Sequence, residues 1–496
     1  MDKNNEIRFI FCYISKAFDR VWHDGLIFKL ESYGISGNVL NWFKNYLSDR
    51  KQRVLTKGFH STFKHVKAGV PQGSVLGPFL FLIYINDIAD CITSNFKLFA
   101  DDTSIFEVVE INSGEIAQKL TYDLSNLNIW ANRWDIKFNP QKTESMLFSR
   151  KREQTNPDIL FAGDTVSSVK IHKHLGLTFS SDGKWSHHII NIYNKAYKRI
   201  NILRMLKYKV DRKSLTTIYT SFIRPILEYG DVIWDNCTNQ EKDLLESVQL
   251  EALRIITGLR RGTSHYKLYA ETGIETLSSR RSQHKLILMY KILRNETPNY
   301  LSNIIEPFIY INENVRYPLR NTRLFNIPVC RTESYRNSYF PSTLREFNML
   351  QLDLVNSNSL QQFKKRIKPN VNNQTGANNS FKYIGPRKYN TLLCQLRNNA
   401  SNLNSDLFND HLLDSSVCRC RYENENAQHY LFECPLYTVS RNRLIENIAQ
   451  IGTYLDHDHL NLETLLYGCM ICNANTNLAL LNSVFEYLQQ TNRFNV

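Results

Sequence analysis

Two kinds of hydrophobic pattern follow one another along the chain. Up to about residue 180, apolar runs of strand length are mixed with amphipathic stretches. From about residue 185 to 295, apolar residues recur every three to four positions, which is typical of helices. The expected strands cover 7–14, 51–56, 62–66, 96–100, 103–109, 144–148, 159–161 and 175–179. The expected helices cover 26–33, 38–47, 79–92, 115–134, 189–206, 214–227, 240–257 and 278–293. This succession predicts the α+β class, with a mixed N-terminal part and a helical part after it.

Two adjacent acidic residues stand at the tip of an expected β-hairpin. Asp101 and Asp102 separate the apolar runs 96–100 and 103–109. Neighbouring carboxylates repel one another, and a divalent cation relieves that repulsion; their hard oxygen ligands suit Mg²⁺. Most such pairs are solvated turns, but the apolar strands on both sides of this pair favour a metal site.

A segment punctuated by glycine and proline leads into the apolar helix expected at 79–92. Residues 68–78 read AGVPQGSVLGP, and such a loop holds its backbone in fixed, close-approach geometry. Gln72 at its centre offers both hydrogen-bond donors and acceptors. The segment is either an ordinary lead-in to a helix or a loop that lies against a substrate.

Three motifs in register make the sequence recognisable: ISKAFDRVWH at 14–23, AGVPQGSVLGP at 68–78 and FADDTS at 99–104. In this order they resemble the palm of a reverse transcriptase, most nearly that of the non-LTR retrotransposons of the Jockey-like group. Three further segments extend the resemblance toward the C-terminus: WDIKFNPQKT resembles the next palm motif, HKHLGL the primer-grip motif and FIRPILEY the helical region after the palm. The resemblance implies a partial right-hand polymerase palm, a helical thumb and connector, and a small zinc-bearing C-terminal segment.

This resemblance implies an RNA-directed DNA polymerase that works by two-metal nucleotidyl transfer. Two Mg²⁺ ions would serve as cofactors, and the partners would be an RNA template, a DNA primer or target, and dNTP. Asp101 would be the main metal ligand and Asp102 its weaker neighbour. Lys142 would be the candidate general acid for pyrophosphate.

The resemblance also implies roles in substrate binding. Phe18 matches the bulky gate that excludes a ribose 2′-hydroxyl. Gln72, with Gly73 in the same loop, would contact the incoming nucleotide and the template. Gly176 and its neighbours would position the primer end.

Two departures from the family pattern lower the expected activity. The first catalytic aspartate of the family stands five residues before the gate aromatic, and that position here is Tyr13. A phenol has a pKa of about 10, so it is neutral at pH 7 and a poor Mg²⁺ ligand. Asp19, past the turn, is not expected to replace it. The chain also begins about a dozen residues before this point, so we expect an N-terminal truncation without fingers or upstream endonuclease. The alternative to an impaired polymerase is a catalytically dead or domesticated nucleic-acid-binding remnant.

Near the C-terminus, three cysteines and a histidine are spaced C-x-C-x8-H-x4-C. Cys418, Cys420, His429 and Cys434 offer the thiolate and imidazole ligands of a closed tetrahedral Zn²⁺ site. Chance clustering of reduced thiols is the alternative. Similar C-x-C…H…C motifs lie at the C-terminal end of the same retrotransposon proteins. This resemblance favours zinc and implies a structural role together with nucleic-acid binding.

The charge balance agrees with a polyanionic partner. The 496 residues include 61 Lys and Arg against 47 Asp and Glu, which gives a net charge of +14. Residues 193–213 hold eight Lys and Arg against one Asp. That segment is either a solvated helix face or a helix that contacts phosphates. No feature indicates a particular protein partner.

The expected organisation has a palm at 1–184, a thumb at 185–300, a connector at 301–367, a polar linker at 368–380 and a C-terminal segment at 381–496. The start lacks the pattern of a signal peptide. The uncharged stretch 68–86 is interrupted by glycines and prolines, so it does not predict a membrane span. We therefore expect an intracellular protein with reduced cysteines and no membrane partner.

Overall fold

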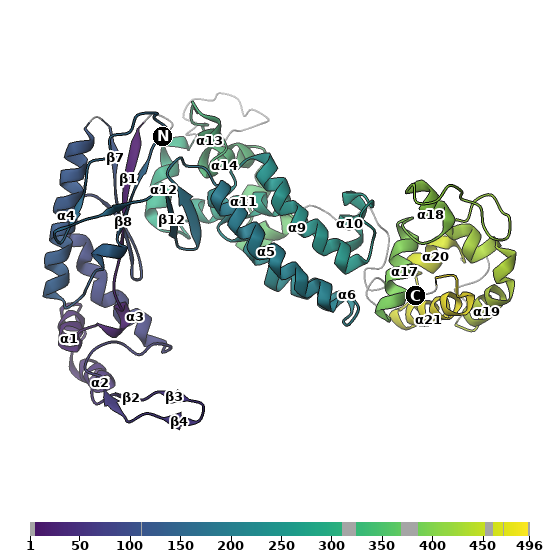
Figure 1. Cartoon of the computed structure of the whole chain (residues 1–496), viewed down its shortest axis with the longest axis horizontal. Coiled ribbons are helices and arrows are strands. Elements are labelled where there is room, and N and C mark those ends of the chain that lie inside the picture. The colour runs from purple at the N-terminus through teal and green to yellow at the C-terminus, as the bar shows by residue number, and fades with distance from the viewer. Residues whose placement is uncertain are drawn as a thin grey trace. The chain divides into compact units, whose positions relative to one another are not determined.

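The computed structural model describes residues 5–110, 112–309, 324–368, 385–451, 460–469 and 471–494. The chain divides into two compact units, residues 1–188 and 189–496 (Figure 1). The predicted five-part division is finer than this and stays a prediction. Its linker at 368–380 lies outside the described residues except for Lys368.

A five-stranded sheet is the framework of the first unit. Its strand order is β11 (Ser167–Ser168), β8 (Glu144–Phe148), β1 (Glu6–Tyr13), β7 (Asp102–Val109) and β6 (Asn95–Phe99). Neighbouring strands are antiparallel except for β11, which is parallel to β8. The strands predicted at 7–14, 96–100, 103–109 and 144–148 are confirmed.

Alternation along β1 determines which face of the sheet is buried against helices. Ile10 and Cys12 belong to a core that also contains residues of α1 (His23–Ser32), α3 (Leu76–Ile85) and α4 (Ser113–Arg133). Because side chains alternate along a strand, Phe11 and Tyr13 share the opposite face. Helices therefore cover one face of the sheet, and the side chains of Phe11 and Tyr13 lie on the other face.

Shorter elements complete the first unit. They are η1 (Ala17–Asp19), α2 (Gly37–Leu47), β2 (Lys51–Gln52), β3 (Leu55–Thr56), β4 (Phe59–His60), β5 (Lys64–His65), η2 (Asn86–Cys91), η3 (Pro140–Lys142), β9 (Leu160–Phe161), β10 (Asp164–Thr165), β12 (Ile171–His174) and β13 (Leu177–Ser180). The helix predicted at 79–92 is α-helical only to Ile85 and then continues as the 3-10 helix η2. The strands predicted at 51–56 and 62–66 pair with one another only through β2 and β5, whereas β3 pairs with β4, which lies before the predicted second strand.

The second unit is built from helices. They are α5 (Ser186–Leu206, which begins in the first unit), α6 (Arg212–Ile218), η4 (Tyr219–Ile223), α7 (Arg224–Glu228), α8 (Asp231–Trp234), α9 (Asn239–Thr257), α10 (His265–Thr272), α11 (Leu277–Leu293), α12 (Asn299–Ile305), η5 (Glu306–Phe308), α13 (Glu333–Arg336), α14 (Tyr339–Asn348), α15 (Leu352–Val355), α16 (Leu360–Arg366), α17 (Arg387–Arg397), α18 (Asn404–Asn409), η8 (His429–Glu433), η9 (Pro435–Tyr437), α19 (Thr438–Ala449), α20 (Leu462–Tyr467) and α21 (Ala474–Thr491). The helix predicted at 214–227 contains the π-turn η4, since Pro225 cannot donate a hydrogen bond to the preceding turn.

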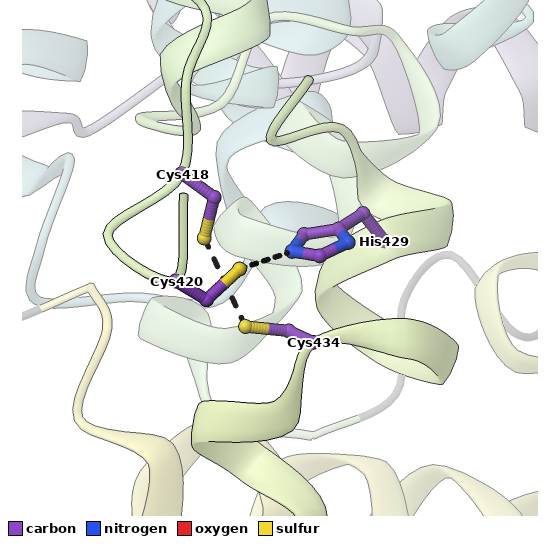
Figure 2. Close-up of side chains that lie close together, drawn as sticks. All are labelled: Cys418, Cys420, His429 and Cys434. Carbon is purple, nitrogen blue, oxygen red and sulfur yellow. Dashed lines mark hydrogen bonds between the residues drawn. The ribbon is translucent and has the colours of Figure 1, made fainter. Parts of the chain in front are cut away.

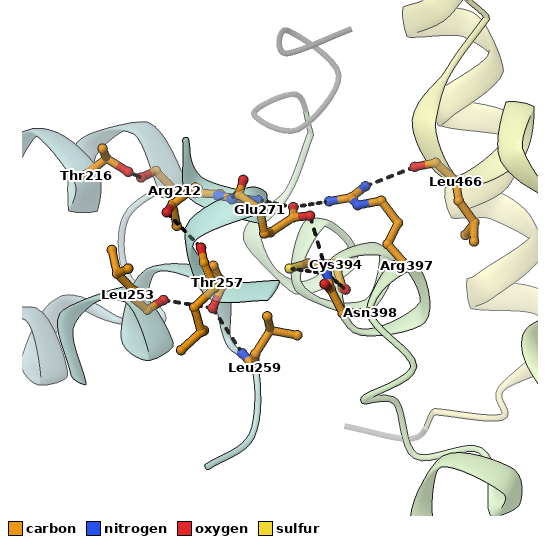
Figure 3. A network of polar contacts seen from close by, with 12 residues as sticks. Arg212, Thr216, Leu253, Thr257, Leu259, Glu271, Cys394, Arg397, Asn398 and Leu466 are labelled. Carbon is orange, nitrogen blue, oxygen red and sulfur yellow. Dashed lines mark hydrogen bonds and ion pairs between the residues drawn. The ribbon is translucent and has the colours of Figure 1, made fainter. Parts of the chain in front are cut away.

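A buried ion-pair network joins helices of the second unit that are far apart in the sequence (Figure 3). Glu271 on α10 accepts hydrogen bonds from Arg212 of α6 at 2.8 Å and from Arg397 of α17 at 2.7 Å. Arg397 also donates to the carbonyl oxygen of Leu466 on α20 at 3.0 Å. The network therefore connects the helices after the sheet with the C-terminal helices.

Within the described residues, no helix combines the length and the hydrophobicity that a bilayer-spanning segment needs. The predicted α+β class is confirmed at the level of a mixed N-terminal part and a helical C-terminal part.

Candidate active site and metal centre

The predicted acidic pair lies at the edge of the sheet where β1 and β6 end and β7 begins. The turn of the β6–β7 hairpin is Ala100 and Asp101, one residue earlier than predicted, so Asp102 is the first residue of β7; Ala100 has a left-handed φ of 50°. Asp102 is paired with Phe99 on one side and with Tyr13 on the other. Direct antiparallel partners project their side chains to the same face about 5 Å apart. The structure therefore places Tyr13 next to Asp102.

Lys142 reaches the same edge from a different motif. The backbone N–H of Asn139 donates to the carbonyl oxygen of Tyr13 at 2.9 Å, which brings the chain before η3 to the end of β1. The side chain of Asn139 caps η3 by accepting from the N–H of Lys142 at 3.2 Å. As a result, Nζ of Lys142 lies 5.0 Å from the centre of the Tyr13 ring, a cation–π distance.

The residues at this edge fit a divalent cation only in part. Asp101 and Asp102 are half-exposed and supply carboxylate oxygens. Across the described ranges, the one group of three or more potential His, Cys, Asp or Glu ligands is the C-terminal cluster, so no third such ligand completes a set with this pair. Tyr13 is 41% exposed, and its phenol adds no carboxylate ligand.

Asp19 is engaged in a different interaction. Nε2 of Gln72 donates to Oδ1 of Asp19 at 2.9 Å. This hydrogen bond ties the centre of the 68–78 loop to η1, so the candidate substrate residue Gln72 and the turn after β1 form one surface. Gly73 beside Gln72 is exposed and has a φ of 81°.

The 68–78 loop packs closely on that turn. The N–H of Val70 donates to the carbonyl oxygen of Phe18 at 2.8 Å. A Cβ on Gly69, whose φ is 93°, would lie 2.9 Å from backbone atoms of Phe18 and Asp19, so this approach requires glycine. The Phe18 ring stacks on Phe81 of α3 at 4.8 Å, which holds the predicted gate residue at the entrance of the loop.

Gly176 lies in the turn of the β12–β13 hairpin. Leu175 and Gly176 both have positive φ, 47° and 82°, as a type I′ turn requires. The hairpin is antiparallel, with His174 paired to Leu177.

Two histidines of β12 contact the sheet near the acidic edge, and neither was predicted as a site residue. The ring of His172 stacks on Phe11 at 3.8 Å, and its Nδ1 lies 2.6 Å from Oε2 of Glu144. Nε2 of His174 lies 3.2 Å from Oγ of Ser104. Burial lowers the pKa of His174, and the nearby carboxylate of Asp102 opposes that shift. These three consecutive polar residues carry no local strand signal, so the sequence pattern did not reveal β12.

The cationic segment 193–213 is mostly a surface of α5 and the turn after it. Aromatic rings accompany its cations: Arg204 donates to the Tyr197 hydroxyl at 3.2 Å, and the guanidinium of Arg199 lies 4.0 Å from the Phe222 ring. One prediction needs correction, because Arg212 is buried in the Glu271 network and cannot contact phosphates. The other seven basic residues are at least partly exposed.

The predicted metal ligands at the C-terminus converge on one point (Figure 2). One ligand atom each from Cys418, Cys420, His429 and Cys434 lies within 4.8 Å of all the others. The two sulfurs of Cys418 and Cys434 are 3.8 Å apart, and Sγ of Cys420 lies 3.3 Å from Nε2 of His429. A tetrahedral zinc ion with Zn–S bonds of about 2.3 Å has sulfur–sulfur edges of about 3.8 Å. The donor set and its spacing therefore fit Zn²⁺.

Short local elements hold these four residues. The N–H of Cys418 donates to the carbonyl oxygen of Tyr422 at 2.9 Å, which closes the turn that carries Cys418 and Cys420. His429 begins η8, and Cys434 follows it, with its N–H 2.7 Å from the His429 oxygen. The Tyr422 ring stacks parallel to His429 at 4.3 Å.

A buried carboxylate ties the cluster to the last helix. Glu425 pairs with Arg493, which follows α21, at 2.5 Å, and its Oε1 lies 3.7 Å from Sγ of Cys418. Burial raises the pKa of the Cys418 thiol to about 12, so a bound metal would have to displace a proton there. All ten cysteines of the chain are free thiols in this structure.

Comparison with known proteins matches the N-terminal part of the chain to a known family. Residues 2–179 match the family described as reverse transcriptase (RNA-dependent DNA polymerase). A probable RNA-directed DNA polymerase from transposon BS of Drosophila melanogaster is 30% identical over 299 residues, which cover 55% of this chain and 32% of that protein. The RNA-directed DNA polymerase from the mobile element jockey of the same species is 28% identical, over 50% of this chain and 28% of that protein.

The chain thus spans about a third of the length of these relatives. A solved telomerase structure from Candida albicans matches with a TM-score of 0.27 and 14% identity, over 54% of this chain and 48% of that chain, which is too weak to compare the two folds. The predicted truncation stays a prediction. The three motifs gather around the end of β1, within the residues that match the reverse transcriptase family, and the chain is related to the Drosophila retrotransposons BS, X-element and jockey.

Proposed function

We propose that this chain is part of a retrotransposon RNA-directed DNA polymerase whose palm is the five-stranded sheet, and that Tyr13 strongly impairs nucleotidyl transfer. The observation that carries the proposal is the register of β1 and β7, in which Tyr13 is the direct partner of Asp102. A position beside Asp102 that suits a carboxylate is filled by a phenol.

In this proposal the acidic turn and Lys142 serve the reacting phosphates. Asp101 and Asp102 would hold Mg²⁺, which supplies activation of the primer 3′-hydroxyl and charge stabilisation of the departing pyrophosphate when bound. Lys142, whose ammonium lies over the Tyr13 ring, would donate a proton to the pyrophosphate. The acidic pair alone offers too few anionic ligands to clamp two ions.

The loops around the edge would bind the substrates. Phe18, stacked on Phe81, would exclude a ribose 2′-hydroxyl, and Gln72 with Gly73 would contact the incoming dNTP and the template. Gly176, in the β12–β13 turn, would position the primer end. These roles follow from the family resemblance together with the placement of each residue.

Nucleic-acid binding does not depend on the missing carboxylate. The exposed cations and aromatic rings of α5 would contact phosphates and bases of the RNA template and of the DNA primer or target. We propose that the Cys3His cluster binds a structural Zn²⁺ and adds a grip on single strands. Tyr13 also supports a second candidate function, a nucleic-acid-binding remnant that does not polymerise.

Primer extension on an RNA template with Mg²⁺ tests the proposal. The unmodified chain is compared with two variants, Tyr13→Asp and Tyr13→Asn. Asparagine has the size of aspartate but carries no charge, so Tyr13→Asn is the control. We expect extension by Tyr13→Asp to exceed that by the other two by at least about tenfold, since one metal-ligand carboxylate contributes on the order of 10²-fold or more to such reactions.

Each other outcome changes the conclusion. Robust extension by the unmodified chain would overturn the proposed impairment. If Tyr13→Asp stays inactive while RNA binding remains steeply salt-dependent, the nucleic-acid-binding remnant is the better description.

A further inference from the structure

We propose that the ribbon formed by residues 50–67 is an arm that binds single-stranded nucleic acid. Hereafter "the ribbon" means these residues, which contain the strands β2, β3, β4 and β5. The inference deepens the proposed function, because the unpaired RNA template would be the strand that the ribbon holds ahead of Gln72.

The ribbon has no core beneath it. Every residue from 51 to 65 is exposed, on both sides of the ladder. Its tip is the two-residue turn Lys57–Gly58, in which both residues have positive φ, 49° and 84°. Figure 1 shows it extending away from α2. An isolated two-stranded ribbon is only marginally stable in water, so its exposed side chains are available to a partner that would also stabilise it.

The positive charge of the ribbon favours a polyanionic binding partner. Residues 50–67 contain six Lys and Arg and no Asp or Glu. The cations are distributed from base to tip: Arg50, Lys51, Arg53, Lys57, Lys64 and Lys67. A nucleic-acid backbone that runs along the ribbon would have cations beside its phosphates from the base to the tip. An acidic protein partner would in addition need an apolar surface that fits the exposed rings.

Exposed aromatic rings favour an unpaired strand over a duplex. Phe59 is 81% exposed and Phe63 is 59% exposed, and the guanidinium of Arg53 lies 4.7 Å from the Phe63 ring. Phenylalanine has no hydrogen-bonding group that would make such exposure favourable in water. Rings interleaved with cations form a stacking platform for bases, and only unpaired bases offer their faces to it.

The base of the ribbon leads directly to the candidate substrate loop. Nη1 of Arg50 donates to the carbonyl oxygen of Gly69 at 3.3 Å, and Nε2 of His23 lies 2.9 Å from the same oxygen. Gly69 is the close-packed glycine that precedes Gln72. A strand bound along the ribbon therefore arrives at the loop where Gln72 would contact the template.

Fluorescence anisotropy with labelled oligonucleotides tests the ribbon. The probes are a uridine 20-mer RNA and a blunt RNA duplex, each measured over a range of salt concentrations. One variant is Phe59→Ser with Phe63→Ser; a second replaces Lys51, Arg53, Lys57 and Lys64 by serine. The control replaces four exposed cations elsewhere in the first unit by serine: Lys44, Arg150, Arg152 and Lys170.

We expect the aromatic variant to lose about tenfold or more in affinity for the 20-mer, with little change for the duplex, because stacking on a ring contributes about tenfold per base. The cation variant should reduce the slope of log K against log salt by about 3, since four phosphate contacts at about 0.7 each are lost. The control should keep both the affinity and the slope. Circular dichroism should show unchanged unfolding of every variant.

The ribbon proposal and the polymerase proposal fail separately. Asp101→Asn should abolish any extension by the Tyr13→Asp chain while single-strand binding persists. Unchanged affinity and slope in both ribbon variants would contradict the proposal that the ribbon binds single strands. Equal losses of affinity for the 20-mer and the duplex would also contradict it. If the variants instead abolish self-association in sedimentation while RNA binding is intact, the ribbon is a protein interface and the proposal is wrong.

Discussion

Tyr13 and Asp102 are direct partners across the antiparallel strands β1 and β7. Their side chains share one face of the sheet at its edge, beside the turn that carries Asp101. The Lys142 ammonium lies over the Tyr13 ring, 5.0 Å from its centre, so the phenol has both Asp102 and this ammonium as neighbours. The identity of residue 13 therefore decides how much negative charge this edge carries.

A carboxylate at position 13 should make the stability of the chain depend on a divalent cation. Tyr13→Asp brings a third acid within about 5 Å of Asp102, and without a cation the like charges destabilise the fold. We expect its melting temperature in EDTA to lie a few degrees below that of Tyr13→Asn, and Mn²⁺ to restore it, because a ligand that binds only the folded state stabilises it. Differential scanning fluorimetry over a Mn²⁺ series measures this; an equal response of both variants would contradict it.

The Cys3His cluster should hold about one zinc ion per chain. Cys418→Ser removes a thiolate and is expected to reduce the bound zinc to about a fifth or less and to lower the melting temperature, since metal binding contributes to folding. Cys472→Ser is the matched control, because Cys472 is a half-buried thiol outside the cluster. Elemental analysis after gel filtration measures the zinc, and unchanged content in Cys418→Ser would remove the site.

The Glu271 network should be a main source of stability in the second unit. Glu271→Gln leaves the buried Arg212 and Arg397 without their carboxylate, and we expect a loss of about 3–5 kcal/mol in the free energy of unfolding. Glu251→Gln is the control: Glu251 pairs with Arg204 nearer the surface, and its loss should cost less than about 1 kcal/mol. Urea denaturation followed by circular dichroism at pH 7 compares the two, and equal losses would refute the network's importance.

The same network predicts a dependence on acid. Burial alone would raise the pKa of Glu271, but Arg397 and Arg212 outweigh it and lower the pKa to about 2. The folded-state pKa lies below the unfolded value of about 4.3, so the stabilisation is complete above that value and is lost as the pH falls toward 2. Between pH 5 and 3, the unmodified chain should therefore lose more stability than Glu271→Gln; parallel losses would contradict this assignment.

Lys29 should stabilise the first unit through its charge as well as through the packing of its aliphatic side chain. Lys29 is buried. Its Nζ lies 2.6 Å from Oδ1 of Asp87 and 3.7 Å from the centre of the Trp134 ring. Lys29→Ala removes the ion pair and leaves a cavity, with an expected cost of about 3–5 kcal/mol. Lys29→Met keeps the packing and should cost about 1–3 kcal/mol. Chemical denaturation compares them with Lys44→Met on the exposed face of α2, and a cost for Lys29→Met as small as that control's would show that the charge contributes nothing.

Local patterns predicted much of the N-terminal part. The strands that became β1, β6, β7 and β8 were found because apolar runs bounded by turn residues are local signals. β12 was not predicted because three of its four residues, His172, Lys173 and His174, are polar and give no apolar stripe. Arg212 was wrongly grouped with the surface cations because its neighbours in the sequence are exposed, while its carboxylate partner Glu271 is 59 positions away.

By itself, the sequence determined which chemical groups are present: two adjacent aspartates between apolar runs, a Gly and Pro loop around Gln72, a tyrosine at position 13, and a Cys3His spacing that suits zinc. These are properties of residue identity and of short spacing, which do not depend on how the chain packs. Only the tertiary structure decided which of these groups meet. The pairing of Tyr13 with Asp102, the position of Lys142 over the phenol and the burial of Arg212 with Glu271 and Arg397 all join residues that are distant in the sequence. Such pairings follow from sheet register and helix packing, which are set by the burial of whole faces and not by any local pattern.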